Sequence, residues 1–184
     1  MTEEERELVT KKLTYAVSIL CDGMDPSLIP EVGMNIVYAL PDARDPSEVA
    51  GVEGRIVRLR DRIQPVGEVA FGASDHIARI VLTSMRFDPV VRSAANIRFS
   101  EEVVSALRDQ VPDVASFDRL NEPEGVKSMD WGVASCCSEG EVPDVIYDHG
   151  SIGKEPMIRI LGEDPVEVAH NIIMLSGCIR NTYP

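Results

Sequence analysis

Residues 71–76 combine glycine, hydroxyl, carboxylate and imidazole groups at a point where a predicted strand gives way to a helix. Ser74 or Asp75 can cap that helix, whose first backbone N–H groups have no partner within the helix and suit an anion. His76 falls in the first turn, where the helix dipole favours a neutral imidazole that can act as a base or a hydrogen-bond partner. Strand-to-helix turns of this kind are also common in α/β proteins without any chemical role, so both interpretations stay open.

A second glycine-containing segment follows a predicted strand, at residues 148–156. Gly150 and Gly153 allow backbone N–H groups to approach an oxyanion, and Lys154 offers a compact positive charge. The segment is not a Walker phosphate loop, because the four-residue spacer and the hydroxyl residue after the lysine are missing. A plain tight turn is the alternative interpretation.

A third segment, residues 92–98, carries two arginines and an amide near the end of a predicted strand. Arg92, Asn96 and Arg98 either clamp a diphosphate or solvate the edge of a sheet. Together with Arg55, the three segments would supply a locally positive cavity in a chain whose formal net charge is -13. Such focusing of the electrostatic field is what an anionic substrate requires.

The sequence contains no spacing typical of a transition-metal site, because its three histidines are far apart and form no HxxxH or HExxH pattern. Mg²⁺ makes fewer demands, since it uses few protein carboxylates and shares phosphate oxygens. The carboxylates that could hold this ion through water are Asp75, Asp144, Asp148 and Glu155. Helix capping and surface solvation are the competing interpretations for most of them.

The chain as a whole has the composition of one globular domain. Its 184 residues are 44% hydrophobic and only 5% aromatic, so the core must be mainly aliphatic. The 31 acidic residues against 18 basic ones repel a phosphate backbone, which argues against nucleic acid as a partner. Most of the basic residues are arginine, which suits bidentate phosphate binding or simply reflects genomic composition.

Cysteine usage and the first residues favour a reduced, cytoplasmic protein. Cys21, Cys136, Cys137 and Cys178 form no CxxC pair and no disulfide framework. Residues 1–7 carry four glutamates where a signal peptide needs basic and then apolar residues. No stretch reaches the roughly 18 consecutive apolar residues that a membrane-spanning helix needs, so we expect no membrane partner.

Hydrophobic periodicity predicts alternating strands and helices. Helices are expected over 2–23, 74–85, 100–107, around Trp131 and over 164–175. Strands are expected over 34–40, 54–63, 68–71, 114–117, 142–147 and 157–161, and residues 97–99 are expected to be the end of another strand, whereas 45–51 allows only a turn or two of helix. This order predicts an α/β fold: a single layered domain with a central mixed β-sheet flanked by helices, plus an N-terminal amphipathic helix. The apolar faces of the first and last helices also suggest a homodimer.

Seven motifs occur in the order and spacing of a known family. They lie at residues 29–36, 51–57, 71–79, 92–98, 117–123, 131–132 and 143–157. On these motifs the chain resembles the ThiN family of archaeal thiamine-phosphate synthases over roughly residues 25–176. We therefore expect an N-terminal helix, 1–24, packed on or beside a ThiN-like domain, 25–184.

The resemblance implies a transferase of thiamine biosynthesis that joins hydroxymethylpyrimidine diphosphate to thiazole phosphate, giving thiamine phosphate and pyrophosphate. The family's essential arginine and histidine fall on Arg55 and His76, which we expect to be catalytic. The residues expected to bind substrate or phosphate are Asn35, Ser74, Arg92, Asn96, Arg98, Gly150, Gly153 and Lys154. Mg²⁺ is expected to arrive with the diphosphate of the substrate, with Asp75, Asp148 and Glu155 as candidate ligands.

Two other functions fit parts of the pattern. In some members of the family the domain stands behind a DNA-binding segment as a regulator, so the alternative is a non-catalytic sensor that binds thiamine phosphate. Such regulators look as though they have lost the essential arginine and histidine, so the presence of both here favours catalysis. A small-molecule aldolase or lyase would need a reactive lysine in a dry pocket, and the polar, glycine-flanked setting of Lys154 favours phosphate binding instead.

Overall fold

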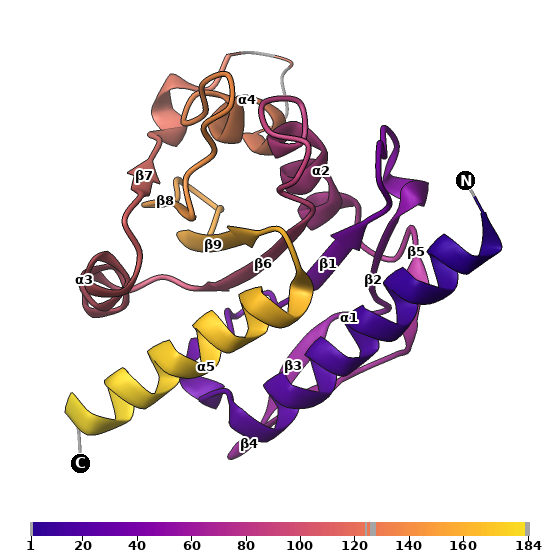
Figure 1. Cartoon of the computed structure of the whole chain (residues 1–184). Coiled ribbons are helices and arrows are strands. Elements are labelled where there is room, and N and C mark those ends of the chain that lie inside the picture. The colour runs from indigo at the N-terminus through magenta and orange to yellow at the C-terminus, as the bar shows by residue number, and fades with distance from the viewer. Residues whose placement is uncertain (1, 124, 126–127, 183–184) are drawn as a thin grey trace.

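The computed structural model describes residues 2–123, 125 and 128–182, and its centre is a seven-stranded sheet (Figure 1). The strands lie in the order β5-β2-β1-β6-β9-β8-β7. Their bounds are β1 Ile36–Ala39, β2 Val49–Val52, β5 Val69–Phe71, β6 Ser93–Arg98, β7 Val114–Ser116, β8 Val145–Asp148 and β9 Met157–Gly162. β7 and β8 run parallel, whereas the other neighbouring strands run antiparallel. The predicted α/β fold with a mixed sheet is therefore confirmed.

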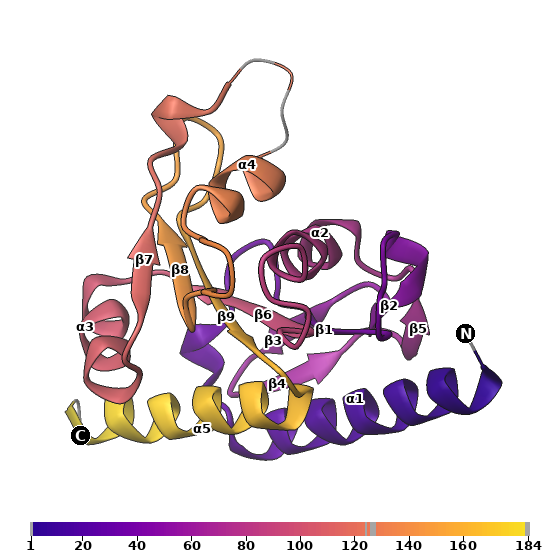
Figure 2. The same cartoon turned by 45° about the horizontal axis from the view of Figure 1, so that its top comes forward.

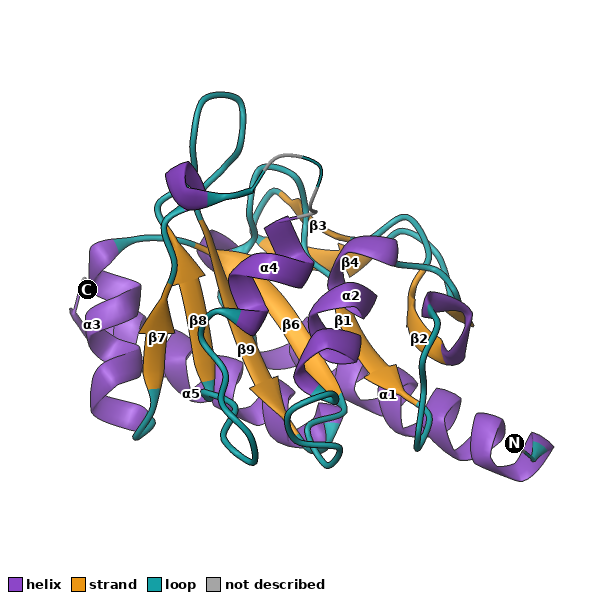
Figure 3. Ribbon diagram, turned by 90° about the horizontal axis from the view of Figure 1, so that it is seen from above, coloured by secondary structure: helices purple, strands orange, loops and turns teal. Residues whose placement is uncertain are grey.

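Helices cover both faces of this sheet. α1 (Glu3–Gly23) and α5 (Pro165–Thr182) lie side by side on one face (Figure 2). α2 (Asp75–Ser84) and α4 (Ser128–Ala134) pack together on the opposite face (Figures 2 and 3). α3 (Glu101–Gln110) lies beside the β7 edge and also contacts α5. The candidate site residues Ser74, Asp75 and His76 lie at the N-terminal end of α2.

The N-terminal helix forms as its sequence predicts. Thr2 accepts a hydrogen bond from the Glu5 backbone N–H, and the Glu5 carboxylate accepts one from the Thr2 N–H, which completes a capping box. The buried face of α1 is Val9, Leu13, Ala16, Val17 and Leu20. α1 packs against α5, whose buried hydrophobic residues include Val168, Ala169, Ile172 and Leu175. The two apolar faces that suggested a homodimer are thus covered within one chain, and the homodimer stays a prediction without that support.

One predicted strand is two strands. Residues 54–63 were expected to run as a single strand, but β3 (Ile56–Leu59) and β4 (Arg62–Pro65) form a two-stranded hairpin. The chain reverses because Arg60 adopts a left-handed conformation, with φ 60°. Ile56 and Ile63 are the buried members of the hairpin, and its other face is exposed as expected.

The sequence pattern predicted neither β2 nor the beginning of β6. The cap at Asp45 opens a single 3-10 turn, η2 (Pro46–Glu48), and the chain then enters β2, where no strand was expected. All four residues of β2 are buried, so it lacks the alternation that marks a half-exposed strand. β6 ends at Arg98, within the strand end predicted at 97–99, but its beginning at Ser93 was not predicted, because its polar residues Ser93 and Asn96 are buried and hydrogen-bonded to neighbouring strands and loops.

Candidate functional site

A cavity of about 450 Å³ lies between the loop before β1 and the N-terminal end of α2. Met157 of β9 also contributes to its wall. The sequence-predicted residues that line it are Asn35, Arg55, Ser74, Asp75, His76 and Asn96. The structure therefore brings together residues from four separate segments, including both that were expected to be catalytic.

Arg55 reaches this cavity through an unusual backbone conformation. Its φ is 79°, and it follows Gly54 with φ 66°, so two consecutive residues are left-handed. For a side chain other than glycine this costs about 1–3 kcal/mol, a strain that proteins keep mainly at functional positions. The guanidinium donates a hydrogen bond to the Val32 carbonyl, which holds it against the loop. Gly33 makes room for it, because a Cβ there would lie 3.2 Å from Arg55 Cδ.

The first turn of α2 presents backbone donors to the same cavity. Ser74 is the N-cap, yet within the described part of the chain its hydroxyl makes no capping hydrogen bond. The N–H groups of the first turn have no partner inside the helix, so they and the helix dipole favour an anion. The helix start lies close to β2 because residue 51 is glycine: a Cβ at Gly51 would lie 3.3 Å from Ser74 Cβ.

His76 is neutral at physiological pH. Desolvation, together with the positive charges of Arg159, Arg119 and Arg55, lowers the pKa of its imidazole to about 4, and the negative charge of Asp75 opposes this shift. Part of the His76 surface is nevertheless exposed to solvent, and the residue lines the cavity. A neutral imidazole offers one N–H donor and one acceptor, so His76 is equipped for hydrogen bonding more than for donating a full proton.

The two asparagines in the cavity wall are tied to the backbone. Asn35 pairs with Val52 through two hydrogen bonds, with its amide donating to the carbonyl at 2.8 Å and its Oδ1 accepting from the N–H at 2.9 Å. Asn96 accepts from the Asn35 N–H at 2.8 Å and donates to the Gly33 carbonyl at 3.1 Å. These bonds fix the loop that carries Gly33 and so hold the surface on which Arg55 rests.

Comparison with family models decides what kind of protein carries this cavity. The model described as "Thiamine-phosphate synthase ThiN" matches residues 12–174. The chain belongs to the ThiN family. The matched range contains Arg55, His76 and every other residue that lines the cavity. The resemblance inferred from the sequence motifs is therefore confirmed, and with it the assignment to a transferase family of thiamine biosynthesis.

Two curated relatives support the ThiN assignment. The chain is 44% identical over 179 residues to the bifunctional thiamine biosynthesis protein ThiDN of Methanocaldococcus jannaschii, covering 96% of this chain and 42% of that protein. It is 41% identical over 154 residues to the thiamine-phosphate synthase ThiN of Methanothermobacter thermautotrophicus, covering 80% of this chain and 81% of that protein. The chain thus spans less than half of the bifunctional relative and most of the other.

Solved structures agree with the ThiN fold. The crystal structure of the C-terminal domain of protein MJ0236 matches with a TM-score of 0.90 at 42% identity, covering 97% of this chain and 98% of that one. YgbL of Escherichia coli matches with a TM-score of 0.57 at 13% identity, covering 98% and 90%. YgbL is described as an aldolase, epimerase or decarboxylase, and at this identity the likeness shows the fold alone.

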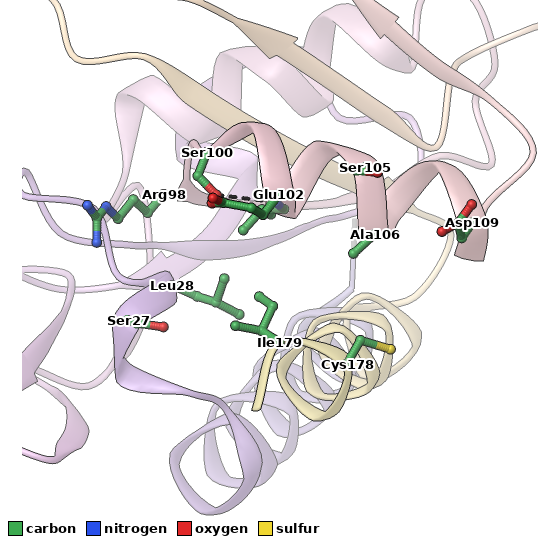
Figure 4. Close-up of a pocket in the computed structure, with 11 residues that line it drawn as sticks. Ser27, Leu28, Arg98, Ser100, Glu102, Ser105, Ala106, Asp109, Cys178 and Ile179 are labelled. Atoms are coloured by element: carbon green, nitrogen blue, oxygen red, sulfur yellow. Dashed lines mark hydrogen bonds between the residues drawn. The ribbon is translucent and has the colours of Figure 1, made fainter. Parts of the chain in front are cut away.

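Two arginines predicted to bind phosphate lie outside the ThiN cavity. Arg92 donates two hydrogen bonds to the Ala39 carbonyl and stacks over the Tyr38 ring, 4.6 Å from its centroid. It lines a different cavity, beside Lys12. Arg98 lies at a third cavity, of about 490 Å³, between η1 (Pro26–Leu28), α3 and α5 (Figure 4). Figure 4 shows its side chain pointing away from that cavity. Arg98 also lines a cavity of about 400 Å³ together with Val32 and Gly33, which line the candidate site as well.

Replacing Arg92 by alanine is therefore expected to change the kcat/KM of this chain for the reaction proposed below by less than about threefold, which corresponds to roughly 0.6 kcal/mol. The substitution removes hydrogen bonds that hold the end of β1, so a loss of about 1 kcal/mol in the free energy of unfolding is expected instead. Steady-state kinetics and urea denaturation measure the two effects. A tenfold fall in kcat/KM with unchanged stability would place Arg92 in the site after all.

The second glycine segment borders the cavity without lining it. Lys154 forms an ion pair with Glu122 at 2.9 Å. Glu155 accepts hydrogen bonds from the Glu31 and Val32 backbone N–H groups, at 2.9 and 3.2 Å. These bonds join the segment to the loop beneath Arg55. Gly150 and Gly153 are both left-handed, and the Gly150 N–H donates to the Asp148 carboxylate at 2.8 Å.

The candidate magnesium ligands are separated in the structure. Asp75 lines the cavity and pairs with Arg79 at 2.9 Å, Asp148 is enclosed by two arginines, and Glu155 binds backbone N–H groups. Among the described residues no group of three or more His, Cys, Asp or Glu side chains could hold a metal ion. The described part of the chain also has no helix that is long and apolar enough to cross a membrane.

Sequence reasoning missed two buried arginines near His76, Arg119 and Arg159. Arg159 is fully buried in the middle of β9, and Arg119 is nearly so. A signal for Arg159 was present, because a lone arginine interrupts the apolar run from Met157 to Leu161. A buried charge at such a position requires a partner, and the structure supplies Asp148.

Proposed function

We propose that this chain catalyses the joining of hydroxymethylpyrimidine diphosphate to thiazole phosphate, forming thiamine phosphate and pyrophosphate. The observation that carries the proposal is one cavity, in a ThiN family chain, that gathers Arg55, His76 and the N-terminal turn of α2. All three suit a phosphorylated substrate: a guanidinium, a neutral imidazole and a set of backbone donors.

In the proposed reaction the bond between the pyrimidine methylene carbon and the diphosphate oxygen breaks, and a bond from that carbon to the thiazole nitrogen forms. The aminopyrimidine ring stabilises the positive charge that develops on the carbon. The protein then has to stabilise the negative charge on the departing pyrophosphate and to align the thiazole nitrogen. Arg55 and the first N–H groups of α2 are placed to stabilise the pyrophosphate.

We assign His76 a hydrogen-bonding role in this reaction. Because its pKa is lowered to about 4, only a small fraction of the imidazole carries the extra proton at neutral pH. The neutral ring can donate its N–H to the leaving oxygen or align the pyrimidine. Direct protonation of the leaving group by His76 is therefore disfavoured in this environment.

The charge state of His76 leads to a titration experiment. Its imidazole resonance, identified by its loss in the His76→Gln variant, is expected to show a midpoint near pH 4, well below the ordinary value of about 6.5. Because the folded chain binds this proton more weakly than the unfolded chain, His76 should lower the stability of the fold as the pH falls from about 6.5 towards 4. The glutamine variant should lack this contribution. A midpoint near 6.5 would contradict the assignment.

Mg²⁺ is part of the proposal as an ion that arrives with the substrate. When bound to the diphosphate it would neutralise charge on the leaving group. The described residues do not form a ready-made metal site, so we assign no ligand to it. The same reaction in excess chelator should give no thiamine phosphate, and Mg²⁺ should restore it.

The direct test incubates the purified chain with both substrates and Mg²⁺ and measures thiamine phosphate and pyrophosphate. We expect both products in equal amounts, and we expect both to be lost in the Arg55→Gly and His76→Gln variants. A chain that binds thiamine phosphate but forms none would instead be the sensor considered from the sequence.

We also propose that residues 25–184 form the synthase domain and that the helix of residues 1–24 is docked on it. The burial of the α1 apolar face against α5 supports this division. We also propose a cytoplasmic location, which is supported by the free thiols of Cys21, Cys136 and Cys137, since a reducing compartment preserves them.

A further inference from the structure

Arg119, Asp148 and Arg159 form a buried charged cluster beside the cavity. Asp148 ends β8, Arg159 lies in β9, and Arg119 begins the short helix η3 (Arg119–Asn121). Asp148 accepts hydrogen bonds from Arg119 Nε at 2.5 Å, from Arg119 Nη2 at 3.1 Å and from Arg159 Nη2 at 2.7 Å. The side chains of Asp148 and Arg159 are 0% exposed and that of Arg119 is 7% exposed.

The cluster carries more positive than negative charge. Two guanidinium groups share one carboxylate, which leaves one positive charge in excess. Arg159 Nε is also buried without a hydrogen-bond partner among the described residues, although the ring of Phe117 lies 5.2 Å from its guanidinium carbon. A buried, uncompensated charge and an unpaired donor both cost stability, so packing alone does not account for this arrangement.

Strand register connects the cluster to the cavity. Arg159 lies directly opposite Asn96 on the neighbouring strand β6, and directly opposite residues of an antiparallel pair point to the same face. Met157, two residues earlier in β9, points to that face as well. Asn96 and Met157 both line the cavity, so Arg159 continues its floor towards β8. The charges of Arg159 and Arg119 also act on the imidazole of His76.

We propose that Arg159, held by Asp148, places a fixed positive charge beside the cavity floor that anchors the diphosphate group of the substrate and the pyrophosphate product. The anion compensates the excess charge of the cluster when it binds. Arg159 acts through the electrostatic field from its place beside Asn96 and Met157, so it is a positioning residue rather than a catalytic one. The identity of the anion rests on the proposed function.

A purely structural role of the cluster predicts different binding results from the proposed electrostatic role. If the cluster only fastened β8, β9 and η3 together, breaking it from either side would loosen the floor and weaken anion binding. If its charge matters, removing a positive charge weakens binding, whereas removing the negative charge of Asp148 strengthens it. The sign of the change therefore separates the two roles.

The test measures the affinity for inorganic pyrophosphate by calorimetry in the folded full chain, with folding of each variant checked by circular dichroism. Arg159→Met should raise the Kd about tenfold, and Arg159→Lys, which keeps the charge, should stay within about threefold of the native value. Asp148→Asn should lower the Kd. Arg92→Met is the matched control, because it removes a guanidinium from another cavity and should leave the Kd unchanged.

Each result decides the matter. Equal weakening by Arg159→Met, Arg159→Lys and Asp148→Asn would overturn the proposal in favour of a structural role. If Asp148→Asn fails to fold, the comparison of Arg159→Lys with Arg159→Met still separates the two roles. Arg119→Met, at a less buried position, should also weaken pyrophosphate binding, as Arg159→Met does. Because pyrophosphate binding needs no turnover, a chain that binds the anion through this charge but makes no thiamine phosphate would contradict the proposed function and leave this inference standing.

Discussion

Replacing Arg55 by glycine is expected to reduce thiamine phosphate formation by about 10²-fold or more, while the free energy of unfolding changes by less than about 1 kcal/mol. The activity falls because the variant loses the guanidinium that we propose to stabilise the departing pyrophosphate. The stability is preserved because glycine adopts the left-handed conformation of residue 55 without strain. That gain offsets the lost hydrogen bond to Val32 and the greater freedom of glycine in the unfolded chain.

Arg60→Gly is a matched control for this prediction. Arg60 is also a left-handed arginine, with φ 60°, but it lies in the exposed turn between β3 and β4. Its replacement removes the same charge and relieves the same kind of strain, away from the cavity. Turnover measured by separating thiamine phosphate from the substrates should be unchanged in Arg60→Gly. Similar activity losses in the two variants would show that the overall charge of the hairpin matters, rather than the position of Arg55.

The parts of the fold with strong local signals could be predicted from the sequence. α1 has a capping box at Thr2 and an apolar stripe along its length, and both signals depend only on neighbouring residues. The hairpin of β3 and β4 was read as one strand because its turn has no glycine or asparagine: Arg60 adopts the left-handed conformation that those residues usually supply. β2 was not predicted, because a strand that is buried on both faces shows no alternation of apolar and polar residues.

The candidate site was predictable only in part. Arg55 and His76 were found through the family motifs, and the cavity that joins them arises from contacts between distant segments. Lys154 was expected beside them because of its glycine neighbours, but the local pattern could not reveal its ion pair with Glu122, 32 residues away along the chain. Arg159 shows the same limit, since its charged partner Asp148 comes from the adjacent strand.

Replacing Asp148 by alanine is expected to cost about 3–5 kcal/mol of the free energy of unfolding, the largest stability effect that we predict for a single side chain. At present its carboxylate accepts hydrogen bonds from two guanidinium groups, which overcome the effect of burial and keep its pKa below the ordinary value. Without it, Arg119 and Arg159 would face each other as buried, uncompensated positive charges. Urea denaturation at neutral pH measures the loss.

The control for Asp148 is another acidic residue paired with an arginine but open to solvent. Asp130 lies 3.5 Å from Arg79, and its side chain is 36% exposed. Asp130→Ala should cost less than about 1 kcal/mol, because water screens such a pair. Repulsion between the two arginines also predicts that Arg159→Met restores part of the stability lost in Asp148→Ala. If the double variant were no more stable than Asp148→Ala, the carboxylate would be stabilising the fold through packing rather than through charge.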